Sequence, residues 1–288
     1  MIDEREEKPV RQSDFEPITI SSKRRLGLPN FSEVPDLIYM VFVLTWKDTL
    51  IQYRQSILGF LWGFIKPFGQ MLAFSMLFGL IAKNITPNVP YPIFVFSGLF
   101  PWIFFSQATT LSSFSFINGS GLFAKTRFPK IILPIASVLT AGIDFLMQFG
   151  VLSLMLVYYS IKPSVNLAYL PLFVAPMVLM GFGIGLVMGT LNVKYRDIGH
   201  ALPMLLQFWM FASPVVYSEE LIVPAWRDLY NLNPMTPIII GIRWCILGTG
   251  TLEFYPLLYS GIVCVVVFFI GLTVYQRYND DFLDYLTT

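Results

Sequence analysis

Residues 170–193 read LPLFVAPMVLMGFGIGLVMGTLNV, a segment that contains no charged side chain. A bilayer core about 30 Å thick is crossed by about 20 helical residues, since each residue adds about 1.5 Å to a helix. The segment is therefore long enough and apolar enough to cross a membrane as a single helix. Comparable apolar segments occur on both sides of it along the chain, and together they decide the fold class.

The same criterion predicts six transmembrane helices, of which this segment forms the fourth. Only two charged side chains fall within them. Asp144 lies in the third span, and Lys66 lies at the edge of the first, where a lysine can extend its ammonium group toward water. We therefore expect an all-α integral membrane protein with spans at about residues 60–82, 91–117, 131–160, 170–191, 201–217 and 254–275.

The composition agrees with a membrane protein and excludes several soluble classes. Hydrophobic residues make up 55% of the 288 residues and charged residues 13%, whereas soluble domains contain about 25% charged residues. Phenylalanine (27 residues) outnumbers lysine and arginine together (19). These values exclude a disordered chain, a coiled coil, a protein that binds nucleic acid through a basic face, and an ordinary cytosolic enzyme.

The sequence offers no cofactor site of its own. A single histidine, His200, and two cysteines without metal-ligand spacing do not make a metal site. The phosphate-binding motif G-x-x-x-x-G-K-[ST] is absent, because no glycine is followed directly by lysine. We therefore expect no metal and no cofactor in this chain. An ATP-driven process would need ATP and magnesium on a separate subunit.

The distribution of basic residues predicts the orientation in the membrane. Fourteen of the 19 lysines and arginines lie on the same side as the N-terminus, and four lie on the opposite side. The more basic side is cytoplasmic, so both termini are expected in the cytoplasm. Residues 1–35 carry charges of both signs and few large apolar side chains, and they are expected to form a polar cytoplasmic tail.

Two segments fit neither a span nor a polar loop. In residues 36–58, Lys47, Asp48 and Arg54 are interleaved with apolar residues, which predicts an amphipathic helix in the cytoplasmic interface. Residues 219–253, on the outer side, mix prolines, aromatic residues and a short apolar run. Polar backbone at membrane depth must be buried in protein or line a wet cavity. We therefore expect a re-entrant helical cap between the fifth and sixth spans.

Small residues mark one face of the fourth span. Gly181, Gly185 and Gly189 lie four residues apart and therefore point in a similar direction on a helix. This spacing allows two helices to approach closely. The partner is either another helix of the same chain or a second copy at a dimer or gating seam.

Aromatic residues gather in the second span, the fifth span and the cap. They form either the interfacial belts common to membrane proteins or the lining of a wide pathway, in which sugar rings stack on aromatic faces. The candidates for such a pathway are Phe100, Trp102, Phe105, Trp209, Tyr217 and Trp226.

Residues 53–67 read YRQSILGFLWGFIKP and resemble the signature Y-[RK]-x-S-x-L-G-x-x-W-x-x-x-x-P. That signature is typical of the permease subunits of ABC-2-type polysaccharide exporters, which serve O-antigen, capsule and wall teichoic acid. The resemblance continues in order to residues 233–234 and beyond, and it identifies residues 36–285 as a single transmembrane domain. The matching signature positions are Tyr53, Arg54, Ser56, Leu58, Gly59, Trp62 and Pro67.

The resemblance implies a homodimer of six-span subunits that works with two copies of a separate ATPase subunit. It also implies a bacterial inner-membrane location and a polyprenyl-diphosphate-linked glycan as substrate, either O-antigen-like or teichoic-acid-like. For the diphosphate and for lipid access we consider the cations Arg54, Lys66, Lys125 and Arg127. For coupling to the ATPase we consider Asn118, Lys125, Arg127, Phe128, Pro129, Tyr195, Arg196 and Asp197.

Other functions remain open at the level of sequence. A membrane-embedded transferase acting on lipid-linked sugars would need a base and donor-binding acids, for which the chain offers only His200 and the pair Arg196 and Asp197. A passive channel or scaffold is a second alternative. An ABC-2 exporter of small lipids or drugs is a third, although the signature argues against it. We expect a transport subunit without enzymatic activity of its own.

Overall fold

The structure, a computed structural model, describes residues 34–54, 57–82, 89–123, 129–223 and 226–278. Within these ranges all regular secondary structure is helical. The all-α class predicted from the sequence is therefore confirmed for the described part of the chain. Outside the described residues lie most of the predicted tail, Ser56, Lys125, Arg127 and Phe128.

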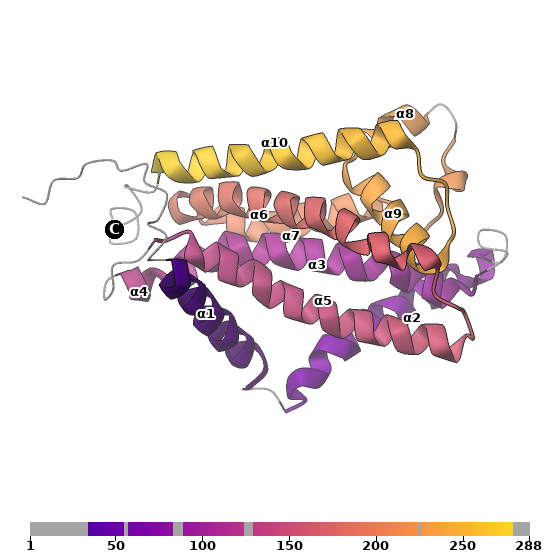
Figure 1. Cartoon of the computed structure of the whole chain (residues 1–288), viewed down its shortest axis with the longest axis horizontal. Coiled ribbons are helices and arrows are strands. Elements are labelled where there is room, and N and C mark those ends of the chain that lie inside the picture. Colours follow the sequence, from indigo (N-terminus) through magenta and orange to yellow (C-terminus); the bar gives the residue numbers. More distant parts are fainter. Residues whose placement is uncertain (1–33, 55–56, 83–88, 124–128, 224–225, 279–288) are drawn as a thin grey trace, which may run out of the picture.

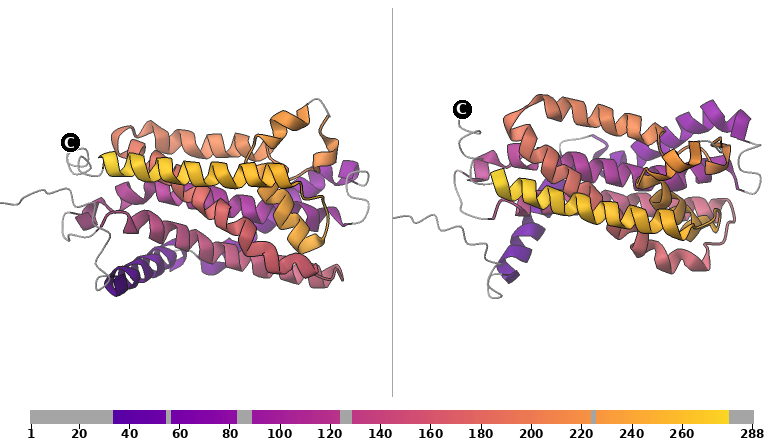
Figure 2. Two further views of the ribbon diagram at one scale, coloured as in Figure 1. Left: turned by 45° about the horizontal axis from the view of Figure 1, so that its top comes forward. Right: turned by 90° about the horizontal axis from the view of Figure 1, so that it is seen from above.

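Four long helices run side by side and form the body of the subunit (Figures 1 and 2). They are α3 (Tyr91–Asn118), α5 (Ile132–Tyr158), α6 (Leu170–Lys194) and α10 (Phe254–Tyr278). Each is long and apolar enough to cross a membrane. Helix α3 packs along both α5 and α6, and α6 also packs along α10. All four helices begin and end within a few residues of the segments expected from the sequence.

The N-terminal helices are less regular than expected. Helix α1 (Val34–Arg54) ends before residue 58, and α2 (Trp62–Ala82) follows a single turn of 3-10 helix, η1 (Gly59–Leu61). The described chain has four candidate spans, or five if α1 and α2 count together as one bent span. Gly59 has a φ of +46°, which glycine adopts more readily than other residues. The glycine of the signature thus allows the turn that leads into α2.

The fifth predicted span is wrong in its bounds. Helix α7 (Asp197–Phe211) has 15 residues, fewer than the roughly 20 that cross a bilayer, and it ends well before residue 217. Residues 212–217 form turns and bends instead. Pro214 contributes to this end, because proline lacks an N–H donor and disfavours the helical conformation of the residue before it.

Short helices between α7 and α10 cover the end of the subunit where α10 begins (Figure 1). They are η3 (Glu219–Leu221), α8 (Arg227–Asn231) and α9 (Met235–Leu247). Nearly all of α9 is buried, and it packs against α6 and α3. Two further short elements, α4 (Ser120–Phe123) and η2 (Val165–Tyr169), follow α3 and precede α6.

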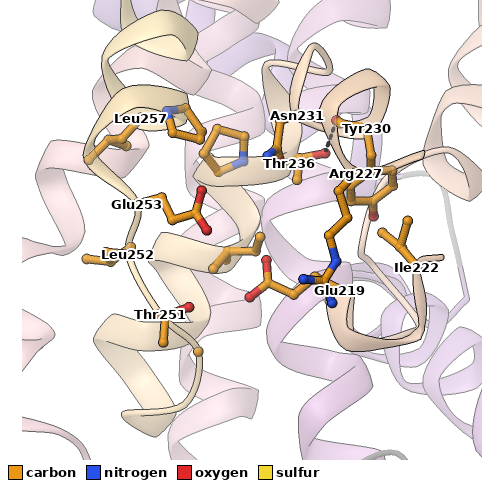
Figure 3. Close-up of a pocket in the computed structure, with 14 residues that line it drawn as sticks. Glu219, Ile222, Arg227, Tyr230, Asn231, Thr236, Thr251, Leu252, Glu253 and Leu257 are labelled. Carbon is orange, nitrogen blue, oxygen red and sulfur yellow. Dashed lines mark hydrogen bonds between the residues drawn. The ribbon is translucent and has the colours of Figure 1, made fainter. Parts of the chain in front are cut away.

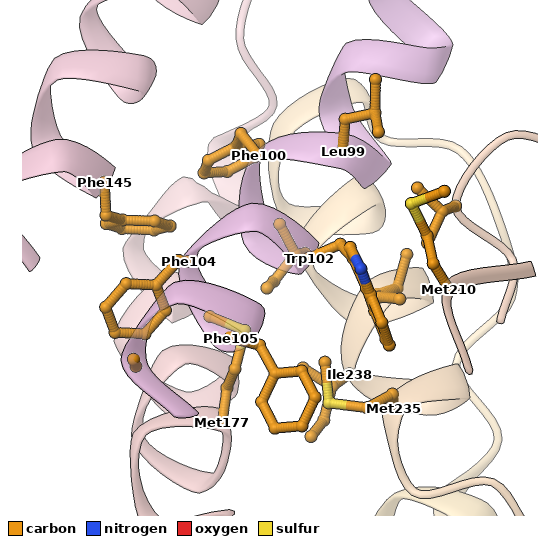
Figure 4. Close-up of a cluster of buried hydrophobic side chains, with 14 of the residues drawn as sticks. Leu99, Phe100, Trp102, Phe104, Phe105, Phe145, Met177, Met210, Met235 and Ile238 are labelled. Carbon is orange, nitrogen blue, oxygen red and sulfur yellow. The ribbon is translucent and has the colours of Figure 1, made fainter. Parts of the chain in front are cut away.

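Helix α3 supplies the centre of the hydrophobic core (Figure 4). Phe100 stacks on Phe145 of α5 with ring centroids 5.1 Å apart, and Phe104 packs against the same ring in a tilted orientation with centroids 5.0 Å apart. On the other side of α3, Trp102 and Phe105 meet Met177, Met235 and Ile238 in the same cluster. Aromatic pairs in such geometries contribute about 0.5–1.5 kcal/mol each beyond the burial of their surface.

The glycine face of α6 packs on α3 within the chain. A Cβ atom at Gly185 would clash with Cβ of Ser112, and one at Gly189 would lie 3.1 Å from the carbonyl oxygen of Ser112. A Cβ atom at Gly181 would lie 3.5 Å from Cβ of Ala108. The close approach of the two helices therefore depends on small residues in α6, and this face is occupied by α3 in the subunit.

Candidate functional site

Tyr53, the first residue of the signature, connects α1 to a buried carboxylate in α5. Its hydroxyl donates a hydrogen bond to Oδ1 of Asp144, which is only 4% exposed. Gln52 Nε2 donates to Oδ2 of the same carboxylate over 3.0 Å, and Gln107 Nε2 of α3 also donates to Oδ2. Three donors offset the cost of burying this charge. The carboxylate thereby joins α1, α3 and α5.

Two adjoining cavities lie beside this cluster, with volumes of about 600 and 400 Å³. Gln52, Lys66 and Gln107 line both of them. We refer to the two cavities as the α1–α5 groove, because their walls come from α1, α2, α3 and α5. Other side chains of the groove are Tyr53, Trp62, Pro67, Asp144 and Gln148 in the larger cavity, and Lys47, Asp48, Ser115, Asn118, Ser137 and Thr140 in the smaller.

Two polar groups of the groove are available to a ligand. The ammonium group of Lys66 is exposed and has no carboxylate within 4 Å in the described part of the chain. Gln148 is 2% exposed, and its Oε1 has no hydrogen-bond partner among the described residues. Buried amide oxygens are nearly always hydrogen-bonded in proteins, to protein or to ordered water. The groove thus presents a cation and an unsatisfied acceptor at its wall.

The signature is divided between this groove and the surface around it. Tyr53, Trp62 and Pro67 line the larger cavity. Arg54 and Leu58 are exposed beside the turn at Gly59. The predicted diphosphate cations that the structure describes, Arg54 and Lys66, therefore both lie near the junction of α1 and α2, and only Lys66 lines the cavities.

The predicted coupling residues that the structure describes lie at the end of the subunit where α3 ends and α7 begins. Asn118 is the last residue of α3 and lines the smaller cavity. Tyr195, Arg196 and Asp197 are exposed at the turn between α6 and α7. Pro129 precedes α5, and its carbonyl oxygen accepts a hydrogen bond from the amide of Ile132 over 3.1 Å.

Asn192 fixes this exposed turn and was not singled out in the sequence. It is 1% exposed, its Oδ1 accepts from the amide of Gly199 over 3.0 Å, and its Nδ2 donates to the carbonyl oxygen of Ser113 over 3.4 Å. The start of α7 and the end of α6 are therefore both tied to α3. The only sequence signal for this role was an asparagine at the end of an apolar segment. That signal is weak, because the sequence does not show which groups the side chain contacts.

The predicted aromatic residues fall into two groups. Phe100, Trp102 and Phe105 are at most 3% exposed, and the edge of Trp209 packs against Trp102 and Phe105 with centroid distances of 6.2 and 5.4 Å. These four rings serve packing within the subunit, and a role in lining a pathway stays a prediction. In contrast, Trp226 at the start of α8 is 62% exposed.

The end of the subunit that carries α8 and α9 contains a buried cation that the sequence did not single out. Arg243 of α9 is 5% exposed. Its Nη2 donates to the carbonyl oxygens of Pro214 and Val215 over 3.0 and 3.1 Å, and its Nε donates to Ser97 Oγ over 3.3 Å. A single arginine within the apolar run of α9 was a signal for this site, since charged residues in apolar helices are rarely without a role.

Asn233 completes the attachment of the cap to the end of α7. Its Nδ2 donates to the carbonyl oxygen of Ala212 over 3.0 Å and to Ser213 Oγ over 2.9 Å. Its Oδ1 accepts from Trp209 Nε1 over 2.9 Å and from the amide of Met235 over 3.0 Å. The carbonyl groups left free where a helix ends need such partners. Tyr217, another predicted pathway residue, accepts at its hydroxyl from Tyr230 over 3.2 Å.

Comparison with known proteins relates the groove and the cap to one family. The chain is 29% identical over 253 residues to an O-antigen export system permease protein, RfbA, of Klebsiella pneumoniae, which covers 87% of this chain and 96% of that protein. It is 27% identical over 247 residues to RfbA of Myxococcus xanthus, with 85% and 94% covered. It is 24% identical over 241 residues to the polysialic acid transport protein KpsM of Escherichia coli, with 82% and 92% covered.

The family profile of the ABC-2 type transporter matches residues 39–247. This range includes the α1–α5 groove, the turn between α6 and α7, Asn233 and Arg243. Because the match extends over most of the chain, the protein belongs to the ABC-2 type transporter family.

Proposed function

We propose that this chain is the membrane-spanning permease subunit of a bacterial polysaccharide exporter. It moves a polyprenyl-diphosphate-linked glycan, O-antigen-like or teichoic-acid-like, from the cytoplasm across the inner membrane. The family and the names of the O-antigen and polysialic acid relatives support this function. The observation that carries it in the structure is the α1–α5 groove, which places hydrogen-bonding side chains beside open space along apolar helices.

The chemistry of the groove suits a hydrated glycan. Hydrocarbon offers no hydrogen bonds, so polar side chains within spanning helices face protein or water. Gln107 lies within α3, and Asp144 and Gln148 lie within α5, yet all three line the larger cavity. Amide side chains donate and accept hydrogen bonds, as sugar hydroxyls do. The groove is thus suited to form one wall of a wet conduit, which a second copy of the chain completes in a homodimer.

In this proposal the chain has six spans, namely α2, α3, α5, α6, α7 and α10. Helix α1 lies in the cytoplasmic interface, where its exposed Tyr39, Phe42 and Trp46 meet lipid headgroups. The turns at residues 212–217 carry the chain from the end of α7 to the outer surface, and η3, α8 and α9 form a re-entrant cap. Both termini are cytoplasmic, in agreement with the positive-inside rule.

The diphosphate of the substrate is recognised near the junction of α1 and α2. Arg54 and Lys66 lie there, and Lys125 and Arg127 follow α4 in the sequence. Hydrogen bonds between such cations and phosphate oxygens are about twice as strong as neutral ones. Of the two described cations, Arg54 and Lys66, only Lys66 lines the groove, which supports its role in receiving the lipid-linked end of the glycan.

Export is driven by two copies of a separate ATPase subunit that carry ATP and magnesium. ATP binding closes the pair of ATPases, and the cytoplasmic surface formed by Asn118, Lys125, Arg127, Phe128, Pro129, Tyr195, Arg196 and Asp197 receives this motion. The exposed position of residues 195–197 and their attachment to α3 through Asn192 support such a role. Outward movement of the cap then opens the conduit.

Deletion of the gene and complementation test the function. Cells without the protein are expected to lose surface polysaccharide and to accumulate lipid-linked glycan in the cytoplasmic leaflet. The wild-type gene should restore export, and Lys66→Gln should restore it only in part. Lys162→Gln, which removes an exposed charge outside the groove, serves as the matched control. Normal surface polysaccharide in the deletion strain would contradict the proposal.

A second experiment separates coupling from folding. The double variant Arg127→Ala/Phe128→Ala, purified with its ATPase, is expected to hydrolyse ATP without exporting glycan. Its oligomeric state and thermal stability should match those of the wild type. If this variant still coupled ATP hydrolysis to export, residues 127 and 128 would not be coupling residues. Turnover of a nucleotide sugar by the purified chain alone would instead favour a transferase.

A further inference from the structure

A separate cavity lies at the outer end of the subunit, away from the α1–α5 groove (Figure 3). It has a volume of about 300 Å³, and its walls come from η3, α8, the start of α9, the loop after α9 and the start of α10. Ligand cavities in proteins usually measure about 300–1,000 Å³. The cavity therefore has room for a small polar group and lacks room for a segment of glycan.

Charges of both signs face this cavity. Figure 3 shows the guanidinium group of Arg227 and the carboxylates of Glu219 and Glu253 around the cavity, with Glu253 on the wall opposite Arg227. Glu253 has no lysine or arginine within 4 Å in the described residues. Asn231 and Thr251 add neutral hydrogen-bonding groups to the same lining. A ligand that matches these walls carries an anion and a cation a short distance apart.

The surroundings of the cavity point to the outer surface of the bilayer. Helix α10 begins at the edge of the cavity. Only 17% of the most apolar 18-residue stretch of α10 is buried inside the subunit. Phe254 and Tyr255 at the start of α10 are 70% and 83% exposed, and Trp226 beside Arg227 is 62% exposed. Aromatic side chains at the ends of spans lie at the level of lipid headgroups. The cavity thus lies beside a lipid-facing helix at headgroup depth.

We propose that this cavity binds the zwitterionic headgroup of a phospholipid of the outer leaflet, of the phosphoethanolamine type. Arg227 binds the phosphate, since a guanidinium group matches phosphate oxygens with two parallel hydrogen bonds. Glu253 binds the ammonium group, and Asn231 and Thr251 supply the remaining hydrogen bonds. The acyl chains follow the exposed apolar side of α10. A lipid held in this way connects α8 of the cap to the start of the last span.

Position favours a lipid over the transported glycan as the occupant. The cavity opens beside α10, whereas the α1–α5 groove is walled by α1, α2, α3 and α5. The inference therefore does not depend on the identity of the exported substrate. A binding measurement without transport tests it, and its failure would leave the proposed function untouched.

Lipid binding to the purified full-length protein in detergent, followed by native mass spectrometry, tests the assignment. Phosphatidylethanolamine and phosphatidylglycerol with identical acyl chains are the two probes, because they share the phosphate and differ in the ammonium group. The wild type is expected to retain phosphatidylethanolamine about fivefold better. Glu253→Gln should abolish this preference, whereas Arg227→Gln should lower the retention of both lipids, because both carry the phosphate. Lys162→Gln, an exposed outer charge away from the cavity, should preserve it.

Three results would overturn the assignment. The first is equal retention of both lipids by the wild type, and the second is an unchanged preference in Glu253→Gln together with unchanged retention of both lipids in Arg227→Gln. The third is binding of soluble phosphoethanolamine without binding of the lipid, which would assign the cavity to a soluble ligand. Size-exclusion profiles and melting temperatures equal to those of the wild type exclude misfolding as the cause of any loss.

Discussion

The guanidinium group of Arg243 lies over the ring of Phe94, with 3.8 Å between Cζ and the ring centroid. Cation–π contacts of this kind contribute about 2 kcal/mol or more when they are shielded from water. The same guanidinium group donates hydrogen bonds to the carbonyl oxygens of Pro214 and Val215. One side chain of α9 thus connects the start of α3 to the turn that follows α7.

Replacing Arg243 is expected to loosen this connection. Arg243→Leu leaves the carbonyl oxygens of residues 214 and 215 without a donor, and each buried unsatisfied group costs about 1–3 kcal/mol. We expect the melting temperature in detergent to fall by about 5–10 °C. Arg277→Leu, which removes an exposed arginine in the last turn of α10, should change it by less than about 2 °C. Equal melting temperatures for Arg243→Leu and the wild type would show that the contact is not stabilising.

Gly98 in α3 tests the same contact from the opposite side. A Cβ atom there would lie 2.6 Å from Nη2 of Arg243 and would also clash with the carbonyl oxygen of Val215. Gly98→Ala is therefore expected to lower the yield of folded protein in membranes. Gly142→Ala is the matched control, because a Cβ atom at Gly142 meets nothing within 4 Å and alanine favours helix. Equal yields for the two variants would mean that the turn after α7 adjusts at little cost.

The sequence predicted the long helices well because long uncharged runs have few alternatives to a membrane helix. It predicted α7 poorly, since the break at residues 212–217 is held by distant groups. Tyr91 Oη donates to the carbonyl oxygen of Val216 over 2.8 Å, and Asn233 and Arg243 bind the residues before it. No local pattern reveals partners that lie far apart in the sequence. The same holds for Asp144, whose three donors come from α1 and α3.

The sequence predicted some of the residues of the candidate site, but it did not predict how they are arranged around the cavities. Lys66 was expected to meet the substrate at the membrane edge, and the structure adds Gln107 and Gln148 as neighbours in one cavity. These glutamines are uncharged, so a search for charged residues within spans passes over them. Conversely, Phe100 and Phe105 attracted attention as aromatic residues, although packing against α5, α6 and α9 accounts for their burial.

The hydrogen bond between Tyr53 and Asp144 is expected to couple the two positions energetically. Asp144→Leu leaves the Tyr53 hydroxyl without the acceptor for its proton, whereas Tyr53→Phe removes that hydroxyl. The double variant should therefore be less destabilised than the sum of the single variants, by about 1–3 kcal/mol. Thermal unfolding in detergent of all four proteins measures this difference. Tyr158→Phe, at an 81% exposed tyrosine of α5, should show additive behaviour with Asp144→Leu. Additivity for Tyr53→Phe would contradict a coupling of α1 to α5 through this bond.

Asn192 is expected to influence coupling without contacting the ATPase. Its side chain ties the start of α7 to α3, and the exposed residues 195–197 lie between these attachments. Asn192→Ala removes both hydrogen bonds, so movement at the turn is transmitted less well to α3. We expect the glycan exported per ATP hydrolysed to fall about five- to tenfold, in keeping with the loss of about 1–1.5 kcal/mol. His200→Ala, at an exposed neighbour in α7, should leave this ratio unchanged. A fall in ATP hydrolysis in parallel with export would indicate instead that Asn192 supports assembly with the ATPase, because the ratio of the two rates would then stay constant.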